Sequence, residues 1–452
     1  KLAEAVRGYA TSPDGGHILV QKDGEYLIAD PSKPDLSGAD KVDVAALQTT
    51  KVAADEHWQI FHEVWRRYRD FFYVDNMHGF DWVELREQYA PLVAHVRHRS
   101  DLNYVIGEMI AELNVGHAYI TGGDLGAPAR PTAALPGVVL AYDEAASRYK
   151  IADILRGEND SATYRSPASA VGVQLKKGDY LLAIDGHELQ PQDNPYQHLR
   201  GKAGRTIQLT VHSQPAPSGA RTVAIEPISS ESDLHYHAWV ERNRARVTEM
   251  SGGRLGYVHL PNMGSEGIRE FLRQYYPQRD KAGLVIDDRY NGGGNVSEMV
   301  INRLSRELMM LTFGRTSGYD PYPSALFHGH MVCLLNETSA SDGDIFPAMF
   351  RKAGLGKLIG KRSWGGIIGI TNRGALMDGG TVNVPEFGNT DSKDAWTIEG
   401  YGVDPDIEVD NDVASVIRGE DPQLARGVQV LLELLEVDPR PLPTAPPPPV
   451  KT

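Results

Sequence analysis

The sequence has only one cysteine, Cys333, among its 452 residues, so no disulfide can form within the chain. It also has no run of about 18 apolar residues, which excludes an ordinary membrane-spanning helix. Basic residues are outnumbered by acidic ones, 46 to 60, and the formal net charge is −14. Surfaces that bind nucleic acid or anionic membranes need clustered Lys and Arg to displace counterions. We therefore expect no nucleic-acid partner and no membrane attachment, and the missing disulfide suits a cytoplasmic location.

The apolar fraction is ordinary, at 41%, and the length is enough for about three domains. The first residues show neither an initiator Met nor the apolar core of a signal peptide, so we expect a fragment of a longer protein. Residues 17–21 and 25–29 read as two strands with Gly-containing turns, which is hairpin chemistry. The preceding Ser-Pro-Asp-Gly is typical of β-propeller blades, and two strands cannot close a blade. The sequence thus predicts that the chain starts inside the last blade of a propeller.

Hydrophobic periodicity divides the rest of the chain. Aromatic residues recur at three- and four-residue intervals between residues 54 and 113, which predicts helices with a buried face. From residue 255 to 409 apolar strands alternate with helices, one of them over 297–311, and this alternation favours a mainly parallel sheet. We expect a multidomain α/β and α+β fold with five parts: a remnant propeller hairpin and linker (1–38), a helical subdomain (39–130), a β-rich domain (131–228), an α/β subdomain (229–438) and a proline-rich tail (439–452).

Residues 336–344 place a Ser-Asp-Gly turn between the apolar strand 331–335 and an amphipathic helix. A strand that stops at a tight turn holds a hydroxyl at its tip, and a helix N-terminus offers free N–H groups to an oxyanion. Ser341 is therefore the first candidate nucleophile, with Ser339 as a local competitor. Ser341 or Asp342 could instead be only the N-cap of the helix, and the turn by itself leaves this open.

Two features elsewhere in the chain bear on that choice. The stretch Asn291-Gly-Gly-Gly294 follows a strand and precedes a helix, and its N–H groups suit the second half of an oxyanion hole, because glycine lets the backbone approach a carbonyl closely. It lacks the Gly-Lys-Ser/Thr ending of a phosphate-binding loop. His117 stands beside Gly116 where a helical pattern gives way to a strand, a position that suits a cleft as well as a structural role.

Metal binding finds little support in the sequence. The alternating histidine pairs at 235/237 and 328/330 have no Cys, His or carboxylate at a recognised ligand spacing. Asp287 and Asp288 are neighbours on a strand and point to opposite faces, so we do not expect them to share a reacting group. Cys333 lies within an apolar strand and is expected to be buried and inert. We expect no metal and no cofactor.

The β-rich domain carries a specific pattern. Ser-Pro-Ala at 166–168 is followed by Lys-Gly-Asp at 177–179, an apolar strand and Asp-Gly at 185–186. This pattern resembles a PDZ-like domain of the protease-associated, circularly permuted kind. The resemblance implies capture of an extended peptide end by strand addition. The peptide carboxylate would meet the N–H groups of Gly137, Val138, Val139 and Leu140, although a role as a mere spacer stays open.

With these parts in view, the chain resembles the C-terminal half of the tricorn protease family, which is related to the carboxyl-terminal processing serine proteases. The resemblance runs from about Ala54 to Val437, in the order helical catalytic subdomain, PDZ-like domain and α/β catalytic subdomain. Propellers precede this region in the family, in agreement with the predicted blade. Five motifs carry the resemblance: Asn-Val-Gly-His-Ala-Tyr (114–119), Asp-Asp-Arg-Tyr-Asn-Gly-Gly-Gly (287–294), Ser-Asp-Gly-Asp-Ile-Phe-Pro (341–347), Gly-Leu-Gly-Lys-Leu-Ile-Gly (354–360) and Glu-Gly-Tyr-Gly-Val-Asp-Pro-Asp (399–406).

Carried over by position, the resemblance implies that Ser341 is the nucleophile, His117 the general base and Glu399 the acid that supports the histidine. The backbone N–H of Asp342 would form the oxyanion hole with a glycine of the loop, Gly293 or its neighbour Gly292. Such a set is chemically sufficient, because a serine hydroxyl is a poor nucleophile until a base takes its proton and a third group fixes that base.

Departures from the family patterns sharpen the expectations. The processing proteases use a lysine base where this chain has Gly366, so His117 is expected to be the base. The tricorn pattern has a serine before the histidine where this chain has Gly116, so Glu399 is expected to reach His117 directly or through water. The region expected to line the specificity pocket, Met309 to Thr312, is apolar, which favours cleavage after hydrophobic residues.

We therefore expect a cytoplasmic serine endopeptidase that acts on short peptides in intracellular protein turnover. The resemblance also implies a homo-oligomer, a large ring such as a hexamer. The alternative is a catalytically silent scaffold that binds peptides through its PDZ-like domain, and Gly116 keeps that alternative open.

Overall fold

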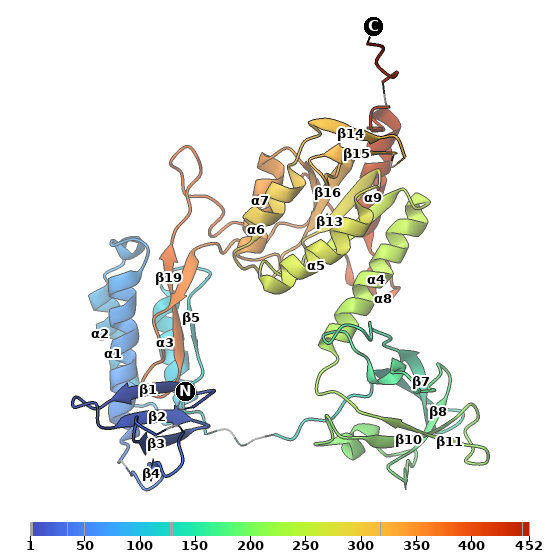
Figure 1. The fold of residues 1–452 in the computed structure, drawn as a ribbon. Helices are drawn as coiled ribbons and strands as arrows, with labels where there is room; N and C mark the ends of the chain where they lie inside the picture. The colour runs from blue at the N-terminus through green and yellow to red at the C-terminus, as the bar shows by residue number, and fades with distance from the viewer. Residues whose placement is uncertain are drawn as a thin grey trace.

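The computed structural model describes residues 3–451, apart from Pro34, Thr49, Ala127, Ala129, Ser317 and Ala445. It consists of an N-terminal sheet, a helical unit, a β-rich unit and an α/β unit (Figure 1). The helical unit and the β-rich unit lie on opposite sides of the view, and each is connected to the α/β unit. The multidomain α/β and α+β fold class is confirmed, whereas the limits of the five parts remain a prediction. No helix in the described part of the chain is long and apolar enough to cross a membrane.

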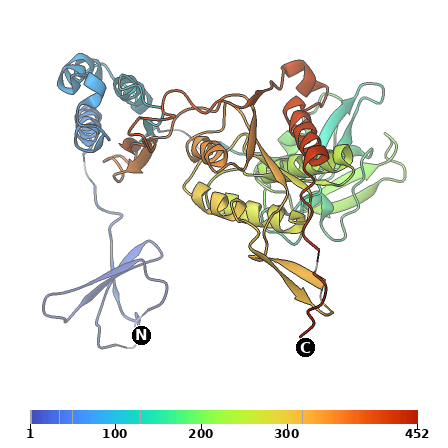
Figure 2. The same cartoon turned by 90° about the horizontal axis from the view of Figure 1, so that it is seen from above.

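The N-terminal sheet has four antiparallel strands, in the order β1-β2-β3-β4, and stands apart from the other units in Figure 2. The predicted hairpin forms its two middle strands, and residues 31–38, expected to be a linker, belong to the connection before the last strand. The outer strands escaped prediction because one begins with glycine and the other is three residues long and mostly charged, so neither shows apolar alternation. The strands are β1 (Gly8–Thr11), β2 (Ile18–Lys22), β3 (Glu25–Ala29) and β4 (Asp40–Val42).

Three helices and a small sheet form the helical unit. The predicted aromatic face is buried, with Phe61 and Tyr68 fully enclosed. The sheet joins distant parts of the chain, because a strand that follows the helices pairs with strands from the C-terminal third, in the order β18-β19-β5. The elements are α1 (Ala53–Phe71), α2 (Trp82–Val93), α3 (Arg99–Ala111), β5 (Tyr119–Thr121), β18 (Gly369–Asn372) and β19 (Thr381–Phe387), with a short 3-10 turn, η1 (Met77–Gly79).

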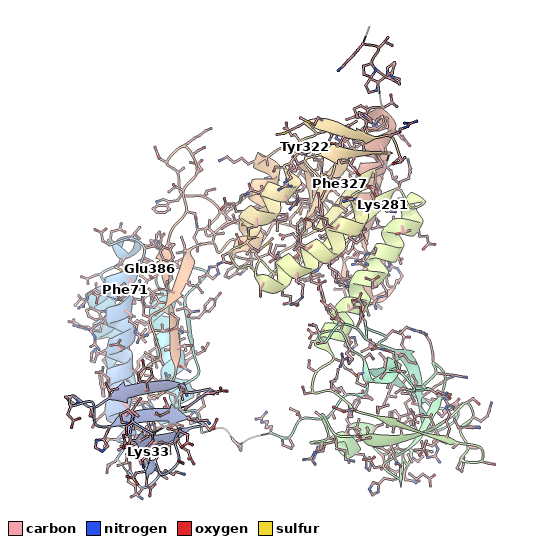
Figure 3. All side chains as sticks on the ribbon, in the orientation of Figure 1. Lys33, Phe71, Lys281, Tyr322, Phe327 and Glu386 are labelled. Atoms are coloured by element: carbon pink, nitrogen blue, oxygen red, sulfur yellow. The ribbon has the colours of Figure 1, made fainter. Side chains whose placement is uncertain are left out.

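Residues 369–387 fall within the predicted α/β subdomain (229–438), whereas in the structure their two strands share a sheet with β5 of the helical unit. Leu376, Val382 and Val384 pack into the same core cluster as the helices. Arg373 lies over the ring of Phe71, 4.1 Å from its centroid, and pairs with Glu386, which ties the returning strands to α1 (Figure 3). The difference arises because a pairing between segments so far apart leaves no local pattern.

The β-rich unit is a six-stranded antiparallel sheet in the order β11-β10-β8-β7-β6, with β9 paired to β8. The strand β6 is therefore an outer edge of the sheet, and Gly137 immediately precedes it. The elements are β6 (Val138–Asp143), β7 (Arg148–Ile154), β8 (Tyr180–Ile184), β9 (His187–Glu188), β10 (Ile207–His212), β11 (Arg221–Ile225), η2 (Pro167–Ser169) and η3 (Pro195–Leu199).

The α/β unit has a five-stranded sheet in the order β12-β13-β16-β17-β20, and every pairing in it is parallel, as predicted. The strands β12, β13 and β16 are buried on both faces, because two helices cover one face and three cover the other, whereas the edge strand β20 is partly exposed. Cys333 is buried in the central strand, and burial raises the pKa of its thiol, as expected for an inert residue. The strands are β12 (Leu255–His259), β13 (Gly283–Asp287), β16 (His330–Leu335), β17 (Gly356–Gly360) and β20 (Ile407–Glu408).

Successive residues of each central strand point alternately to the two helical layers. Residues such as Val285 and Leu334 face the first layer, while Ile286 and Cys333 face the second. The first layer consists of α4 (Ser232–Ser251) and α9 (Pro422–Val437), and the second of α5 (Ser265–Tyr275), α6 (Ser297–Leu304) and α7 (Asp342–Lys352). Two short elements, η4 (Tyr276–Gln278) and α8 (Val413–Ile417), complete the unit.

The prediction of a helix up to residue 311 is wrong, because α6 ends at Leu304. The next residues form β14 (Met310–Gly314), which pairs with β15 (Gly318–Tyr322) in an antiparallel hairpin. Pro321 of this hairpin lines a pocket with Ala282 and His328, which precede β13 and β16. The hairpin therefore lies at the amino-terminal edge of the parallel sheet, as the positions of Tyr322 and Lys281 in Figure 3 also indicate.

Candidate active site

Ser341 lies in the turn that follows β16, directly before the first residue of α7. Its backbone has φ 60 and ψ −121, a conformation that costs a residue other than glycine about 1–3 kcal/mol. Ser341 is the N-cap residue of α7 and forms a capping box with Asp344. The N-cap role that the sequence left open is therefore present, and it does not exclude a catalytic role for a serine held on a strained turn.

Asp344 fixes the turn from inside the first turn of α7. Its Oδ2 accepts the N–H of Ser341 at 2.8 Å, and its Oδ1 accepts the N–H of Gly365 at 2.8 Å. The carboxyl is fully buried, and burial raises its pKa. Sequence reasoning overlooked this residue, although the Ser-x-x-Asp spacing of a capping box was available as a signal.

The local competitor, Ser339, has a structural role. Its hydroxyl donates to the backbone oxygen of Asp288 at 2.8 Å and accepts the N–H of Asn336 at 3.1 Å. The side chain is fully buried. Ser339 thus joins the serine turn to the end of β13, and both hydrogen bonds of its hydroxyl are structural.

The predicted glycine loop packs directly against the serine turn. A Cβ added to Gly293 would lie 2.5 Å from the Cβ of Ser341 and 2.9 Å from the nitrogen of Asp342, so only glycine fits. Gly293 also has φ 84, which favours glycine. The N–H of Ala340 donates to the backbone oxygen of Asn291 at 2.8 Å, which fastens the two segments together.

The three predicted oxyanion donors differ in their partners. The N–H of Gly293 donates to Oδ1 of Asn291 at 2.9 Å. The N–H groups of Gly292 and Asp342 make no hydrogen bond within the described residues. The carboxylate of Asp342 is turned away, since it accepts the N–H and hydroxyl of Ser297 at the start of α6. Two backbone donors therefore remain available beside Ser341.

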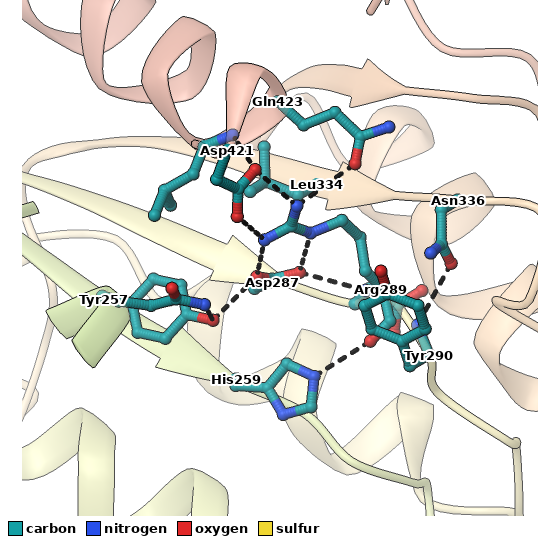
Figure 4. Close-up of polar contacts among 12 residues, drawn as sticks. Tyr257, His259, Asp287, Arg289, Tyr290, Leu334, Asn336, Asp421 and Gln423 are labelled. Carbon is teal, nitrogen blue, oxygen red and sulfur yellow. Dashed lines mark hydrogen bonds and ion pairs between the residues drawn. The ribbon is translucent and has the colours of Figure 1, made fainter. Parts of the chain in front are cut away.

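A buried ion-pair network anchors the glycine loop (Figure 4). Arg289, which is 1% exposed, makes bidentate contacts with Asp287 at 2.8 and 2.6 Å and with Asp421 at 2.8 and 3.0 Å. Tyr257 donates to Asp287 at 2.7 Å, and the ring of His259 contacts the backbone oxygen of Arg289 at 2.9 Å. Removing one partner of such a buried network is costly, so the loop is held rigidly.

Asp287 and Asp288 have separate partners, in agreement with the expectation that they do not share a reacting group. Asp287 pairs with Arg289, whereas Oδ1 of Asp288 accepts the side-chain N–H of Asn291 at 2.8 Å. Burial raises the pKa of Asp288 well above its ordinary value. Asp288 thus supports the same asparagine that holds Gly293.

His117 lies on the helical unit, between α3 and β5, and is 7% exposed. Its ring packs edge-on against Trp364, with centroids 5.2 Å apart. The backbone N–H of Trp364 donates to the oxygen of Ser339 at 2.9 Å, so the tryptophan connects the histidine to the serine turn. Nδ1 of His117 has no hydrogen-bond partner among the described residues. Burial lowers the pKa of His117, opposed by the charge of Glu399, which favours a neutral imidazole.

Glu399 supports the backbone around the histidine and makes no hydrogen bond to the imidazole. Its Oε1 accepts the N–H of Gly116 at 3.0 Å, and its Oε2 accepts the N–H groups of Ile367 and Ile368 at 2.6 and 3.0 Å. Of the two routes expected for Glu399 to reach His117, directly or through water, the direct hydrogen bond is not made. Its charge still acts on the histidine, as the pKa of His117 indicates.

The two glycines that depart from the family patterns occupy crowded positions. A Cβ on Gly116 would lie 3.0 Å from the Cα of Gly366 and 3.1 Å from the Trp364 ring. A Cβ on Gly366 would lie 2.2 Å from that ring, which leaves no room for a lysine. Trp364 fills the space that the two missing side chains would need.

The expectation that Met309 to Thr312 line the specificity pocket is wrong for the chain's own site. These residues belong to β14 and its approach, at the amino-terminal edge of the sheet, whereas Ser341 follows the carboxyl end of β16. Their apolar character consequently says nothing about the residue that this site prefers. Residues 309–312 fit a continuing helix by their local pattern, so the β-hairpin could not be predicted from it.

Comparisons with known proteins match the chain in three successive parts. The family models are the Tricorn protease C1 domain over residues 53–111, the Tricorn protease PDZ domain over 135–230 and Peptidase family S41 over 254–409. Tricorn protease homolog 1 of Streptomyces coelicolor is 35% identical over 441 residues, which is 95% of this chain and 41% of the relative. The Tricorn protease of Thermoplasma volcanium is 31% identical and is matched over 96% of this chain and 42% of its own length.

The fold has an equally extensive counterpart among solved structures. The crystal structure of the tricorn protease matches with a TM-score of 0.88 and 30% identity, over 96% of this chain and 42% of that chain. The chain thus spans less than half the length of these relatives.

Proposed function

Because this chain belongs to the tricorn protease family, we propose that it is a serine endopeptidase that hydrolyses short peptides in intracellular protein turnover. One observation carries the proposal. Ser341 sits on a strained turn against which Gly293 packs, and the backbone N–H groups of their chain neighbours, Asp342 and Gly292, have no partner among the described residues. A half-buried serine hydroxyl with free N–H donors close by is the arrangement that acyl transfer requires.

In the proposed reaction, His117 removes the proton from the Ser341 hydroxyl as the oxygen attacks the peptide carbonyl. The oxyanion of the tetrahedral intermediate accepts hydrogen bonds from the N–H groups of Gly292 and Asp342. His117 then gives its proton to the leaving amine, and water hydrolyses the acyl-enzyme by the same steps. Gly293 allows the glycine loop to approach Ser341 closely. Its N–H would join the oxyanion hole only by breaking its hydrogen bond to Oδ1 of Asn291.

Glu399 acts in this proposal as a positioning residue. By accepting the N–H of Gly116 it holds the backbone next to His117, and by accepting those of Ile367 and Ile368 it joins the helical unit to the segment after Trp364. Its negative charge also stabilises the imidazolium that forms during the reaction.

Peptides are the proposed partners, together with further copies of the chain in a large ring, a hexamer being one size. The family membership supports this assembly, and exposed apolar residues of α8 suit contacts between copies. Val413 and Ile417 of that helix are 75% and 80% exposed. We place the protein in the cytoplasm on the grounds of its single, buried cysteine.

A fluorophosphonate probe tests the function, because it modifies only an activated serine. We expect the full chain to be labelled at Ser341, as located by peptide mass spectrometry, and Ser341→Ala to lose the label. Ser339→Ala serves as the control for the turn and is expected to remain labelled if it folds. Absence of labelling in the folded wild-type chain would refute the protease and favour a silent peptide-binding scaffold.

Glu399→Gln is expected to lower kcat by about 10- to 100-fold, because the loss of a charge-assisted hydrogen bond costs about 1.5–3 kcal/mol. The carboxylate accepts three N–H groups, and an amide must turn its own NH2 toward at least one of them. Steady-state kinetics on a quenched fluorescent peptide measures the effect. Glu408→Gln removes an exposed carboxylate paired with Lys361 and should leave kcat unchanged. Equal kinetics for both variants would remove Glu399 from the mechanism.

A further inference from the structure

A carboxylate of the chain itself occupies an N–H donor of the predicted peptide-binding edge. The N–H of Gly137 donates to Oε1 of Glu231 at 2.6 Å. Gly137 immediately precedes β6, the outer strand of the β-rich sheet, and was one of the residues expected to hold a peptide carboxylate. Glu231 lies outside that sheet, at the residue that precedes α4.

Glu231 does not behave like an ordinary helix-capping residue. It stands at the N-cap of α4, yet its side chain makes no capping hydrogen bond to the helix. The side chain is 11% exposed, and Nε2 of His235 lies 3.9 Å from its Oε2. Burial raises the pKa of Glu231, opposed by the bond from Gly137. The carboxylate of Glu231 is thus largely buried, and the N–H of Gly137 is its hydrogen-bond donor.

The surroundings of Gly137 form a built site. Gly137 has φ 82, and a Cβ there would lie 2.7 Å from Oγ of Ser166, so only glycine allows this approach. Ser166 is fully buried, and its hydroxyl has no hydrogen-bond partner among the described residues. Tyr196 of η3 lies close enough for the charge of Glu231 to raise its pKa, after the larger effect of burial. A second polar donor, Ser166, therefore stands unused beside the first.

We propose that Glu231 is an internal occupant of a carboxylate-binding site at Gly137, which a peptide with a free C-terminal carboxylate enters by displacing it. The two groups have the same chemistry, and two carboxylates at one donor would repel each other. The peptide would add to the edge of β6 and present its terminal carboxylate to the N–H of Gly137 and the hydroxyl of Ser166.

The tether makes Glu231 a strong competitor. A side chain attached to the same molecule acts at an effective concentration in the millimolar range, so it masks the site from weak ligands. The apparent affinity for a peptide equals the intrinsic affinity of the open site multiplied by the fraction of molecules in which the site is open. This inference rests on the proposed peptide substrates: fragments left by another protease carry free C-terminal carboxylates, and the site would select such ends.

Fluorescence anisotropy on the full chain tests the proposal, with Ser341→Ala as the background so that no peptide is cut. The probe is one fluorescein-labelled decapeptide ending in Ala-Val-Ala-Leu, prepared as the free acid and as the C-terminal amide. Glu231→Ala should tighten binding of the free acid by at least about tenfold and leave the amide unchanged. Glu226→Ala removes an exposed carboxylate five residues earlier and should change neither peptide.

Three outcomes would overturn the proposal: equal gains for acid and amide, a gain with Glu226→Ala as large as with Glu231→Ala, or no binding by any variant. Glu231→Gln, which keeps the size of the side chain, should give an intermediate gain, and circular dichroism confirms that each variant is folded. Fluorophosphonate labelling of the chain with Ser341 intact is measured in parallel. Failure of that labelling would sink the protease but not the carboxylate site, so the two hypotheses fail separately.

Discussion

Replacing His117 with alanine is expected to lower kcat by about 10⁴- to 10⁶-fold while the protein stays folded. Without a base the Ser341 hydroxyl keeps its proton and is a poor nucleophile. Gly366 has no side chain that could act as the base, and the Trp364 ring occupies the space that a lysine there would need. Kinetics on a quenched fluorescent peptide measures the loss, and fluorophosphonate labelling should slow in parallel.

His57 offers a matched control for that variant. It is also a buried histidine of the helical unit, 8% exposed, and its Nδ1 likewise has no partner among the described residues. His57→Ala should therefore cost similar packing but leave kcat within about twofold. If His117→Ala retained more than about one hundredth of the wild-type rate, His117 could not be the base.

The pH profile gives a second reading of the same residue. Burial lowers the pKa of His117 below the ordinary imidazole value of 6.5. Because the neutral form is the active base, activity should persist as the pH falls through 6.5 and decline only below it. A profile of kcat/KM against pH checks this, and an acid limb above pH 6.5 would contradict the assignment.

Gly293→Ala is expected to lower kcat by about 10²- to 10³-fold, the usual cost of a damaged oxyanion hole. The new methyl group would lie 2.5 Å from the Cβ of Ser341, so the loop or the turn must move. The substitution also places alanine at φ 84, which adds strain. Since the ion pairs of Arg289 hold the loop from behind, the displacement should fall on the Ser341 turn.

Gly354→Ala is the matched control for that variant. Gly354 also has a positive φ, 67, but its Cβ would meet nothing within 4 Å, so the substitution adds backbone strain without crowding the serine turn. We expect labelling of Ser341 by a fluorophosphonate to stay within about tenfold of wild type for Gly354→Ala and to fall well below that for Gly293→Ala. Similar losses in the two variants would show that crowding at Ser341 is not the cause.

The sequence predicted well the parts of the site that depend on local pattern. An apolar strand, a Ser-Asp-Gly turn and an amphipathic helix are consecutive, so the position of Ser341 follows from residues 331–352 alone. The parallel sheet could also be predicted from the sequence, because apolar strands alternate with helices along the chain. The roles of His117 and Glu399 came from the family resemblance and remain to be tested by the variants above.

Other features had no local signal. The contacts of Glu399 are made to backbone N–H groups, which every residue except proline carries, so no motif records them. The contact of His117 with Trp364 joins residues that are far apart in the chain. It depends on Gly116 and Gly366, because a side chain at either position would collide with the Trp364 ring. The hairpin of β14 and β15 was hidden by a sequence that also fits a continuing helix. The contacts of Glu399 and His117 were thus decided by segments far apart in the chain, and the hairpin by a choice between two local structures.

The return of β18 and β19 to the helical unit affects how this chain must fold during synthesis. The hydroxyl of Tyr68 donates to the backbone oxygen of Asn383, which is 315 residues further along the chain. Domains usually fold in order as they leave the ribosome, but this one lacks part of its core until Val382 and Val384 have been made. His117, the proposed base, likewise waits for Glu399, whose carboxylate holds the N–H of the neighbouring Gly116. The proposed peptidase activity should therefore appear only after synthesis has passed Glu399.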